Sequence, residues 1–481
     1  MSRYAESQPD AYENKWYVMA AVGTGIFLST LDGSIVNVAL PTLARYFDAE
    51  FALVQWVVLA YLLTISTLML SIGRLADMIG KKPLYNAGFV IFTIGSALAG
   101  MSPAIIWLIL FRILQAVGAA MVLALGMGII TEAFPAQERG RALGISGAIT
   151  SVGIVVGPSL GGLLIDTLSW RWIFYVNLPT GILGTWLAWR FVAHVEPPGG
   201  QRFDYWGAIT LFGSLLALLL ALTIGQERGF SAPLILALFA AWALLLAIFI
   251  YVERHAEQPM IDLDLFRDRD LSIGLATGFI TFVAIAGTVI LMPFYLENVL
   301  AYTPRQVGFL LAVVPISVGL TAPVSGALSD RLGTRPITLV GLGILVVGYL
   351  ALSTLTTETD VTGYLLRFLP VGIGMGVFQS PNNSAVMGAA PQGRLGIVSG
   401  MLAITRTLGQ TTGIAVLGAI WAGRVMGAAG RPLPGGATAA PAAAQVAGLQ
   451  DTFVVIVGLV GAAFLVAGWA LLRKQHLGQP A

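Results

Sequence analysis

Residues 73–83 read GRLADMIGKKP, and residues 326–336 read GALSDRLGTRP. Asp77 in the first string corresponds to Asp330 in the second, at an offset of 253 residues (330 − 77). A second pair of strings has the same offset, RALGISG at 141–147 and RLGIVSG at 394–400. Several anchors at one offset indicate that the chain contains two related halves in the same orientation.

The segments around these strings are strongly apolar. Of the 481 residues, 57% are hydrophobic and 10% are charged, whereas soluble domains carry about 25% charged residues. Apolar runs of about 20 residues are long enough to cross a bilayer, and in lipid such runs must be helices. The sequence therefore predicts an all-α integral membrane protein with 14 transmembrane helices, at 16–40, 53–72, 84–102, 104–130, 142–165, 173–193, 206–224, 232–251, 271–296, 306–327, 337–354, 363–388, 395–422 and 452–472.

The repeat divides these spans into parts. Spans 1–6 correspond to spans 9–14, so spans 7 and 8 form an inserted hairpin. The predicted organisation is a tail, a six-helix bundle, the hairpin with its flanking loops, a second six-helix bundle and a second tail, at residues 1–15, 16–193, 194–270, 271–472 and 473–481. The acidic start of the chain is unlike a cleavable signal peptide. The Ala/Gly/Pro-rich segment 423–451 is predicted to be a flexible linker.

An even number of spans places both ends of the chain on one side of the membrane. Loops and tails on that side hold 17 Lys and Arg residues, the opposite loops hold 6, and the remaining 3 of the 26 lie inside spans. Cytoplasmic loops carry an excess of basic residues. Both termini are therefore expected to be cytoplasmic.

Several function classes are disfavoured by composition. The chain has no cysteine, and its three histidines lie outside the spans, so neither a metal site nor an intramembrane catalytic constellation is expected. The net charge of +2 gives no indication of nucleic-acid binding. A receptor or structural protein is the remaining alternative, and duplicated halves favour a transporter over it.

Asp32 is the one acidic residue well inside a predicted span. An ionised side chain at mid-membrane costs about 2.5–3.5 kcal/mol on the insertion scale, so its presence suggests a role. Arg112 in span 4 lies at a matching depth, about 12–14 Å from the same membrane face. The hypothesis is that protonation of Asp32 and substrate binding exclude each other; the alternative is a structural ion pair that locks two helices.

The loop at 73–83 resembles the signature loop of the major facilitator superfamily, with Met78 in place of a usual basic residue. The matching positions and their second-half counterparts are Gly73, Asp77, Gly80 and Lys81, and Asp330, Arg331 and Gly333. The resemblance implies that Asp77 holds the cytoplasmic side closed by capping a helix of the other half, which is expected to begin near Leu395. An ordinary short basic loop is the alternative.

Span 5 contains GIVVGPSLGG at 153–162. Its spacing resembles the antiporter motif of drug/proton antiporters, and the alternative is generic glycine-rich packing. The matching residues are Gly153, Gly157, Pro158, Gly161 and Gly162. LDGSIVNVALP at 31–41, WRWIFYVNLPTG at 170–181 and the inserted hairpin resemble the fourteen-span drug/proton antiporter family. The chain departs from that family at Ala116, a position that is usually glycine, and in lacking further membrane acids in its second half.

This resemblance implies a major facilitator fold and proton-coupled efflux of small amphipathic or cationic compounds. In the family the first-span acid, here Asp32, carries the coupling proton, and the fourth-span arginine, here Arg112, supports it. The implied protein needs a proton gradient but no cofactor, and works as a monomer in the bacterial cytoplasmic (inner) membrane. A carrier for one specific metabolite, with the same fold, is the alternative function.

The expected substrate cavity takes aromatic and amide groups from both halves. Trp56 is either a cavity residue or an interfacial anchor, since tryptophan is common near span ends. Arg406 lies about eleven residues into span 13 without an acid at its depth. It either meets a substrate oxygen or is satisfied by helix-end carbonyls. The candidates are Gln55, Trp56, Tyr61, Gln379, Asn382, Asn383 and Arg406.

Overall fold

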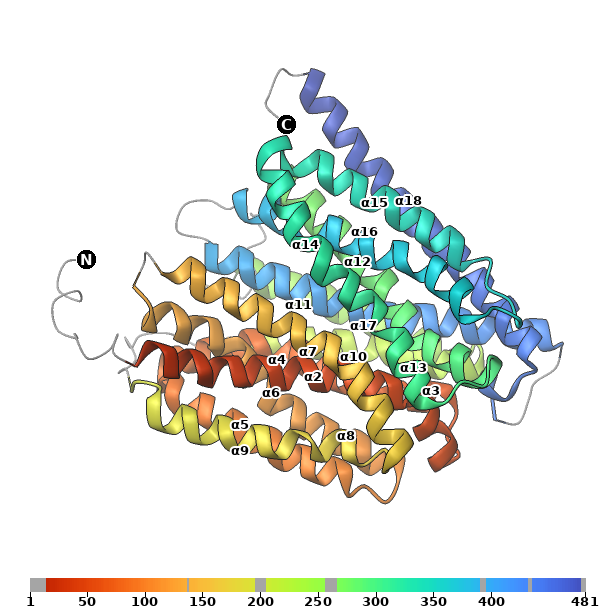
Figure 1. Ribbon diagram of the computed structural model, residues 1–481, viewed down its shortest axis with the longest axis horizontal. Helices are drawn as coiled ribbons and strands as arrows, with labels where there is room; N and C mark the ends of the chain where they lie inside the picture. Colours follow the sequence, from red (N-terminus) through yellow and green to blue (C-terminus); the bar gives the residue numbers. More distant parts are fainter. Residues whose placement is uncertain are drawn as a thin grey trace.

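A computed structural model of the chain describes residues 14–135, 138–194, 205–255, 266–389, 395–430 and 435–476. All regular secondary structure in these ranges is helical (Figure 1). This confirms the all-α fold and follows from the need of each apolar segment to satisfy its own backbone hydrogen bonds in lipid.

The helices fall into a first half, a hairpin and a second half. The first half contains α2 (Lys15–Phe47), α3 (Phe51–Val54), α4 (Trp56–Ile79), α5 (Lys81–Gly100), α6 (Ile105–Ala133), α7 (Arg139–Thr167), α8 (Trp172–Tyr175) and α9 (Asn177–Phe191). The hairpin contains α10 (Tyr205–Arg228) and α11 (Pro233–His255). The second half contains α12 (Arg269–Phe294), the π-helix η2 (Tyr295–Val299), α13 (Pro304–Leu311), α14 (Val313–Leu332), α15 (Thr334–Leu352), α16 (Val361–Gly388), α17 (Leu395–Ala429), the 3₁₀ helix η3 (Ala437–Ala439) and α18 (Ala442–His476).

The number of spans agrees with the sequence-based prediction. Thirteen helical segments within the described residues are long and apolar enough to cross a membrane. The sixth expected span is built differently, from the short α8 followed by the 15-residue α9. Together these two helices cover almost the same residues as the predicted span 173–193.

The internal repeat is visible in the backbone. Gly80 ends α4 and precedes α5 with φ 94° and ψ 151°, and Gly333 lies between α14 and α15 with φ 90° and ψ 153°. Only glycine adopts such angles without strain. The two signature loops therefore make the same tight turn, and this explains why glycine recurs at the offset of 253 residues.

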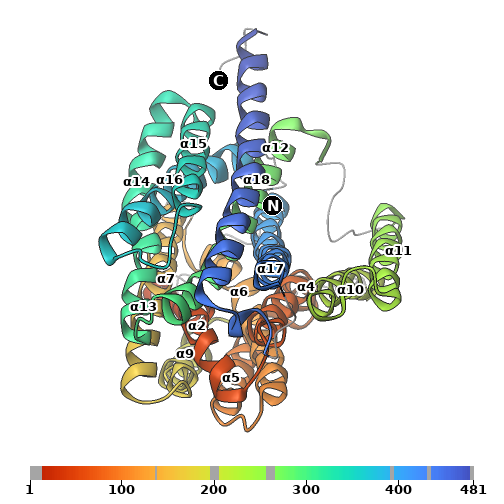
Figure 2. The ribbon, with the colours of Figure 1, turned by 90° about the vertical axis from the view of Figure 1, so that its right-hand side faces the viewer.

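The two halves form a wedge. They converge at one end, here called the closed end, and separate toward the end where both chain termini lie, here called the open end (Figure 1). The hairpin lies to one side, with α10 packed against α4 and α17, and α11 packed against α10 on the outside (Figure 2).

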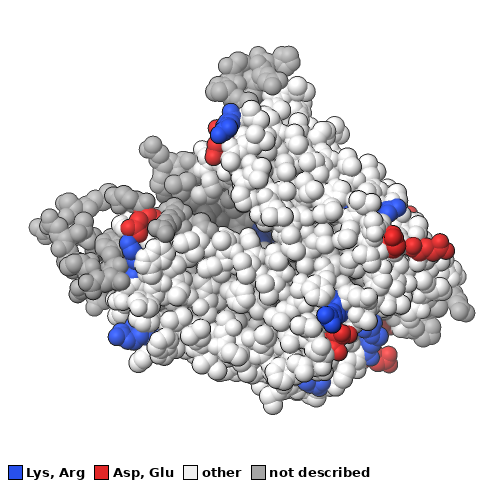
Figure 3. All heavy atoms as spheres, viewed as in Figure 1, with Lys and Arg blue, Asp and Glu red and all other residues white. Residues whose placement is uncertain are grey.

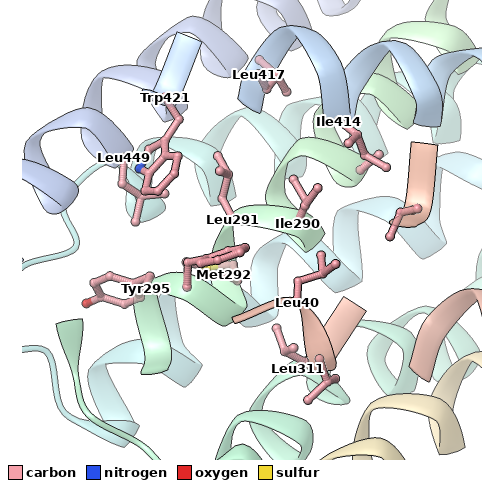
Figure 4. Close-up of a cluster of buried hydrophobic side chains, with 14 of the residues drawn as sticks. Leu40, Ile290, Leu291, Met292, Tyr295, Leu311, Ile414, Leu417, Trp421 and Leu449 are labelled. Atoms are coloured by element: carbon pink, nitrogen blue, oxygen red, sulfur yellow. The ribbon is translucent and has the colours of Figure 1, made fainter. Parts of the chain in front are cut away.

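A hydrophobic cluster seals the closed end. It joins the last turns of α2 to α12, α13 and α17, so that Leu40 of the first half lies near Ile290 and Leu311 of the second (Figure 4). The Phe51 ring meets Phe294 and Trp421 at centroid distances of 5.1 Å and 4.8 Å. Burial of these large apolar side chains stabilises the contact between the halves.

At the open end, four glycines of α4, α7, α16 and α17 have open space beside them. A Cβ atom added at Gly73, Gly147, Gly388 or Gly400 would meet no heavy atom within 4 Å. The space-filling view shows a hollow between the halves on this side, with basic side-chain atoms visible inside it (Figure 3). Among the described residues, the two halves are therefore in contact at the closed end and are separated by this hollow at the open end.

The segment 423–451 differs from its prediction as a flexible linker. Helix α17 continues to Ala429, and α18 begins at Ala442. The buried Gln445 amide donates hydrogen bonds to the carbonyl oxygens of Thr438 (3.2 Å) and Ala440 (2.8 Å). The prediction was wrong for the described part because alanine is the best helix former and its small side chain allows close packing. Residues 431–434 lie outside the described ranges.

Candidate functional site

Asp32 and Arg112 form a buried ion pair in the first half. The Arg112 Nη1 donates to Asp32 Oδ2 at 2.6 Å, and the two side chains are 0% and 1% exposed. The pair joins the middle of α2 to α6, as the matching depths of the two residues predicted. Removal of one partner of such a pair leaves an uncompensated buried charge.

The second carboxylate oxygen of Asp32 is held by two amides. Gln115 Nε2 on α6 and Asn177 Nδ2 at the start of α9 donate to Asp32 Oδ1 at 2.8 Å and 2.9 Å. Both amides also donate to Ser96 Oγ on α5, which in turn donates to the Phe174 carbonyl oxygen. All of these side chains are buried, so four helices of the first half meet at one carboxylate.

The Arg112 side chain has further contacts, with Val57, Gln115 and Tyr61. Its Nε donates to the Val57 carbonyl oxygen at 3.1 Å, and its Nη1 also donates to Gln115 Oε1 at 2.6 Å. The guanidinium lies over the ring of Tyr61, 3.9 Å from the centroid, in a cation–π contact. Tyr61, expected to line a cavity, is therefore part of the support of this ion pair.

Sequence analysis did not identify Gln115, Ser96 or Asn177. Gln115 lies one turn after Arg112, so a helix brings both to one face. Asn177 lies in the VNLP string that carried the family resemblance. Ser96 gave no signal, because a single serine in an apolar span commonly hydrogen-bonds its own helix.

The network is centred on one carboxylate. Every contact of Asp32 named above comes from a donor, which is the arrangement that a carboxylate requires. No group of three or more His, Cys, Asp or Glu residues in the described ranges is placed to hold a metal.

The glycines at 153–162 bring α7 into close contact with two other helices. A Cβ atom at Gly153 or Gly157 would overlap the hydroxyl of Thr30 or Ser34 on α2, the helix that carries Asp32. A Cβ atom at Gly162 would overlap the Pro304 carbonyl oxygen in the second half. The motif therefore serves both packing within the first half and closure against the second.

Replacement of Gly162 by Ala is expected to prevent full closure without unfolding the first half, because the atom it overlaps is backbone of the other half. A cysteine placed at Leu40, which is buried in the closed end, should then become reactive to a water-soluble thiol reagent, and transport should fall. Gly147→Ala on the same helix is the control, because its Cβ meets nothing. Equal reactivity of the cysteine in both variants would contradict the role in closure.

An ion pair also crosses the closed end. Arg45 of α2 contacts Glu297 of η2, whose side chain is 2% exposed. Glu297 directly follows the predicted span 271–296, and sequence analysis did not single it out. The pair lies beside the hydrophobic cluster of the closed end, and it joins the two halves through a charged contact.

The signature-loop residues are placed at the open end. Lys81 contacts Glu132 of α6, so it is engaged within its own half. Helix α17 begins at Leu395, as expected. The Asp77 side chain lies outside the described residues, and its capping role stays a prediction. In the second-half copy, Asp330 and Arg331 are exposed.

Three of the cavity candidates are engaged in packing. Gln55 is buried beside Gly418 of the second half. Trp56 Nε1 donates to Thr223 Oγ1 of α10 at 3.2 Å, which directs its polar edge to the hairpin. Asn382 Nδ2 donates to the Gly274 carbonyl oxygen at 3.1 Å and joins α16 to α12.

Gln379 and Asn383 face the space between the halves. On α16, Asn382 and Val386 face α12, while Gly376 and Ser380 face α14. At about 100° of rotation per residue, Gln379 and Asn383 project between these two directions. Asn383 is exposed, and Gln379 is partly exposed.

Comparison with known proteins gives one consistent result. Residues 22–414 match the family model of the Major Facilitator Superfamily. The riboflavin transporter RibZ of Clostridioides difficile is 35% identical over 85% of this chain and 89% of its own length. The multidrug resistance protein Stp of Mycobacterium tuberculosis is 36% identical over 84% of this chain and 75% of its own length.

A solved structure shares the fold. The bacterial homologue of the human lysosomal transporter Spinster, in an inward-facing and unoccupied conformation, superposes with a TM-score of 0.67 at 18% identity. The match covers 94% of this chain and 97% of that chain. At this level of identity the similarity concerns the fold alone.

Proposed function

Because this chain belongs to the major facilitator superfamily, we propose that it exports small amphipathic molecules in exchange for protons by alternating access. The observation that carries the proposal is the buried carboxylate of Asp32, held at mid-membrane by Arg112 and two amides. Burial of an ionisable group at this depth costs free energy, and in transporters such groups mark proton relays.

The shape of the molecule supports alternating access. The halves are sealed at one end by the cluster around Leu40 and Ile290 and are apart at the other. Helix α2 carries Asp32 and also contributes Leu40 and Arg45 to the seal. A change in the protonation of Asp32 can therefore move α2, which is also one of the helices that form the closed end.

We assign the chain to the fourteen-span drug/proton antiporters on the strings at 31–41, 153–162 and 170–181 and on the hairpin. We further propose that the protein lies in the cytoplasmic (inner) membrane of a bacterium with both termini in the cytoplasm. The excess of basic residues on the side of the termini supports this orientation. The closed end then faces outward and the open end faces inward. The protein is proposed to act as a monomer, because the Asp32–Arg112 pair and the closed end are both completed within one chain.

Carriage of one specific metabolite is the second candidate. It is supported by the similarity to a protein named a riboflavin transporter. The two functions differ in selectivity, since a specific carrier has buried polar groups that reject analogues lacking a matching group. Transport of several unrelated dyes would favour multidrug export over this candidate.

Dye efflux in inverted membrane vesicles tests the proposed function. A proton gradient imposed across the vesicles is expected to drive uptake of amphipathic dyes, and a proton/potassium exchanger such as nigericin should stop it. Vesicles without the protein provide the background. Dye transport that continues unchanged after collapse of the gradient would contradict proton coupling.

A further inference from the structure

Arg406 is a charged residue in the middle of a span for which the proposed function has no use. It lies in α17, eleven residues from the start at Leu395, and is partly exposed. Asp32 and Arg112 also lie inside spans, but they neutralise each other. Arg406 forms no hydrogen bond or ion pair with any described residue. The helix-end carbonyls that could have satisfied it do not do so.

The direction of Arg406 follows from its neighbours on α17. Gly409 and Gly413 face α12, because a Cβ atom at either would meet the backbone of Phe279 or Val283. Trp421 faces the first half, through its ring contact with Phe51. At about 100° per residue, Arg406 projects about 40° from the first direction and about 60° from the second, and lies between them. It therefore points into the space between the halves.

One aromatic ring accompanies the guanidinium. The Arg406 Cζ lies 5.5 Å from the centroid of the Phe282 ring on α12. Such a cation–π contact stabilises the guanidinium. A ring face does not accept the five N–H donors of a guanidinium, so these donors stay available in the hollow.

Among the described residues, the rest of the hollow offers hydrogen-bonding amides and no opposing charge at this depth. Gln379 and Asn383 of α16 face the same space, and α12 packs between α16 and α17. Among the described residues in the middle of the spans, the net charge is that of Arg406, because the Asp32 carboxylate is matched by Arg112. Such a space attracts an anion and repels a cation.

We propose that Arg406 is the docking site for an acidic group, a carboxylate or sulfonate, on an otherwise apolar aromatic substrate. The guanidinium binds the acidic group with charge-assisted hydrogen bonds, the Phe282 ring lies against the apolar part, and the Gln379 and Asn383 amides contact other oxygen atoms. This inference rests on the proposed function and narrows it, since acidic amphipaths replace the cationic compounds that the family resemblance suggested.

The first experiment asks whether position 406 is open to water. The chain contains no cysteine, so an Arg406→Cys variant has a single thiol. A charged methanethiosulfonate reagent should modify it. Ala415→Cys, on the same helix and 0% exposed, should resist the same reagent. An unreactive thiol at 406 in a folded protein overturns the proposal.

The second experiment measures binding in detergent, without a gradient, by fluorescence polarisation. Fluorescein, an anion, and rhodamine 123, a cation, share a xanthene ring system. Wild type should bind fluorescein more tightly. Arg406→Cys should weaken fluorescein binding by about tenfold or more, as expected for loss of a charge-assisted hydrogen bond, and should leave rhodamine 123 binding unchanged or tighter. Trimethylammonium-ethyl methanethiosulfonate should restore fluorescein binding, and the sulfonatoethyl reagent should not.

Arg406→Lys keeps the charge and should keep the preference for fluorescein, which provides a readout if the cysteine variant folds poorly. Tighter binding of rhodamine 123 by wild type, absence of fluorescein binding, or equal loss of both dyes in the variants would each overturn the proposal. Because binding is measured without a gradient, a failure of proton coupling in vesicles contradicts only the proposed function.

Discussion

Replacement of Asp32 by Asn is expected to reduce proton-driven dye transport to the rate measured without a gradient. Asparagine is close to aspartic acid in shape but cannot gain or lose a proton at physiological pH. The substitution leaves the Arg112 cation without its carboxylate, which lowers stability. In the folded variant the helices that close the two ends are unchanged, so exchange of labelled for unlabelled substrate across proteoliposomes, which needs no net proton movement, should continue. Initial rates of energised uptake and of exchange are measured on the same preparation.

Gly33→Ala is the matched control for this variant. Gly33 is adjacent to Asp32, and a Cβ atom there meets nothing within 4 Å, so both activities should be retained. Normal energised transport by Asp32→Asn would leave the ion pair with a structural role. Loss of exchange together with energised transport would also contradict a role confined to the proton.

Replacement of Arg112 by Met is expected to lower the stability of the protein by about 3–5 kcal/mol, because it leaves a buried carboxylate without its cation. The double variant Asp32→Asn with Arg112→Met removes both charges and should recover a large part of this loss. Thermal unfolding in detergent, followed for wild type, both single variants and the double variant, gives the coupling between the two residues.

Arg424→Met provides the comparison for an exposed ion pair. Arg424 lies 3.8 Å from Asp451, and both side chains are more than half exposed, at 61% and 56%. Exposed pairs of this kind contribute little, so its unfolding temperature should stay close to that of wild type. If the unfolding temperature of Arg112→Met is also close to that of wild type, or if the double variant is less stable than both single variants, the buried pair does not stabilise the first half.

Sequence analysis identified Asp32 and Arg112 because charge inside an apolar run is rare and because helical rise converts residue number into depth. The remainder of the network was not accessible in this way. Whether Gln115 and Asn177 reach Asp32 depends on how α6 and α9 are rotated against α2, and no one-dimensional pattern encodes that rotation. For the same reason the sequence could not show which way Trp56 faces. It was a candidate for the cavity, whereas in the structure it hydrogen-bonds Thr223 of the hairpin.

The sequence by itself determined the membrane class, the spans and the duplication. These properties follow from transfer of apolar residues into lipid and from glycine turns, which act locally along the chain. Only the tertiary structure decided which end is closed, that 423–451 contains packed helices, and that Arg406 faces the hollow with no ion-pair or hydrogen-bond partner among the described residues. These properties depend on which helix faces meet, and such contacts between residues far apart in the chain arise only once the two halves are packed together.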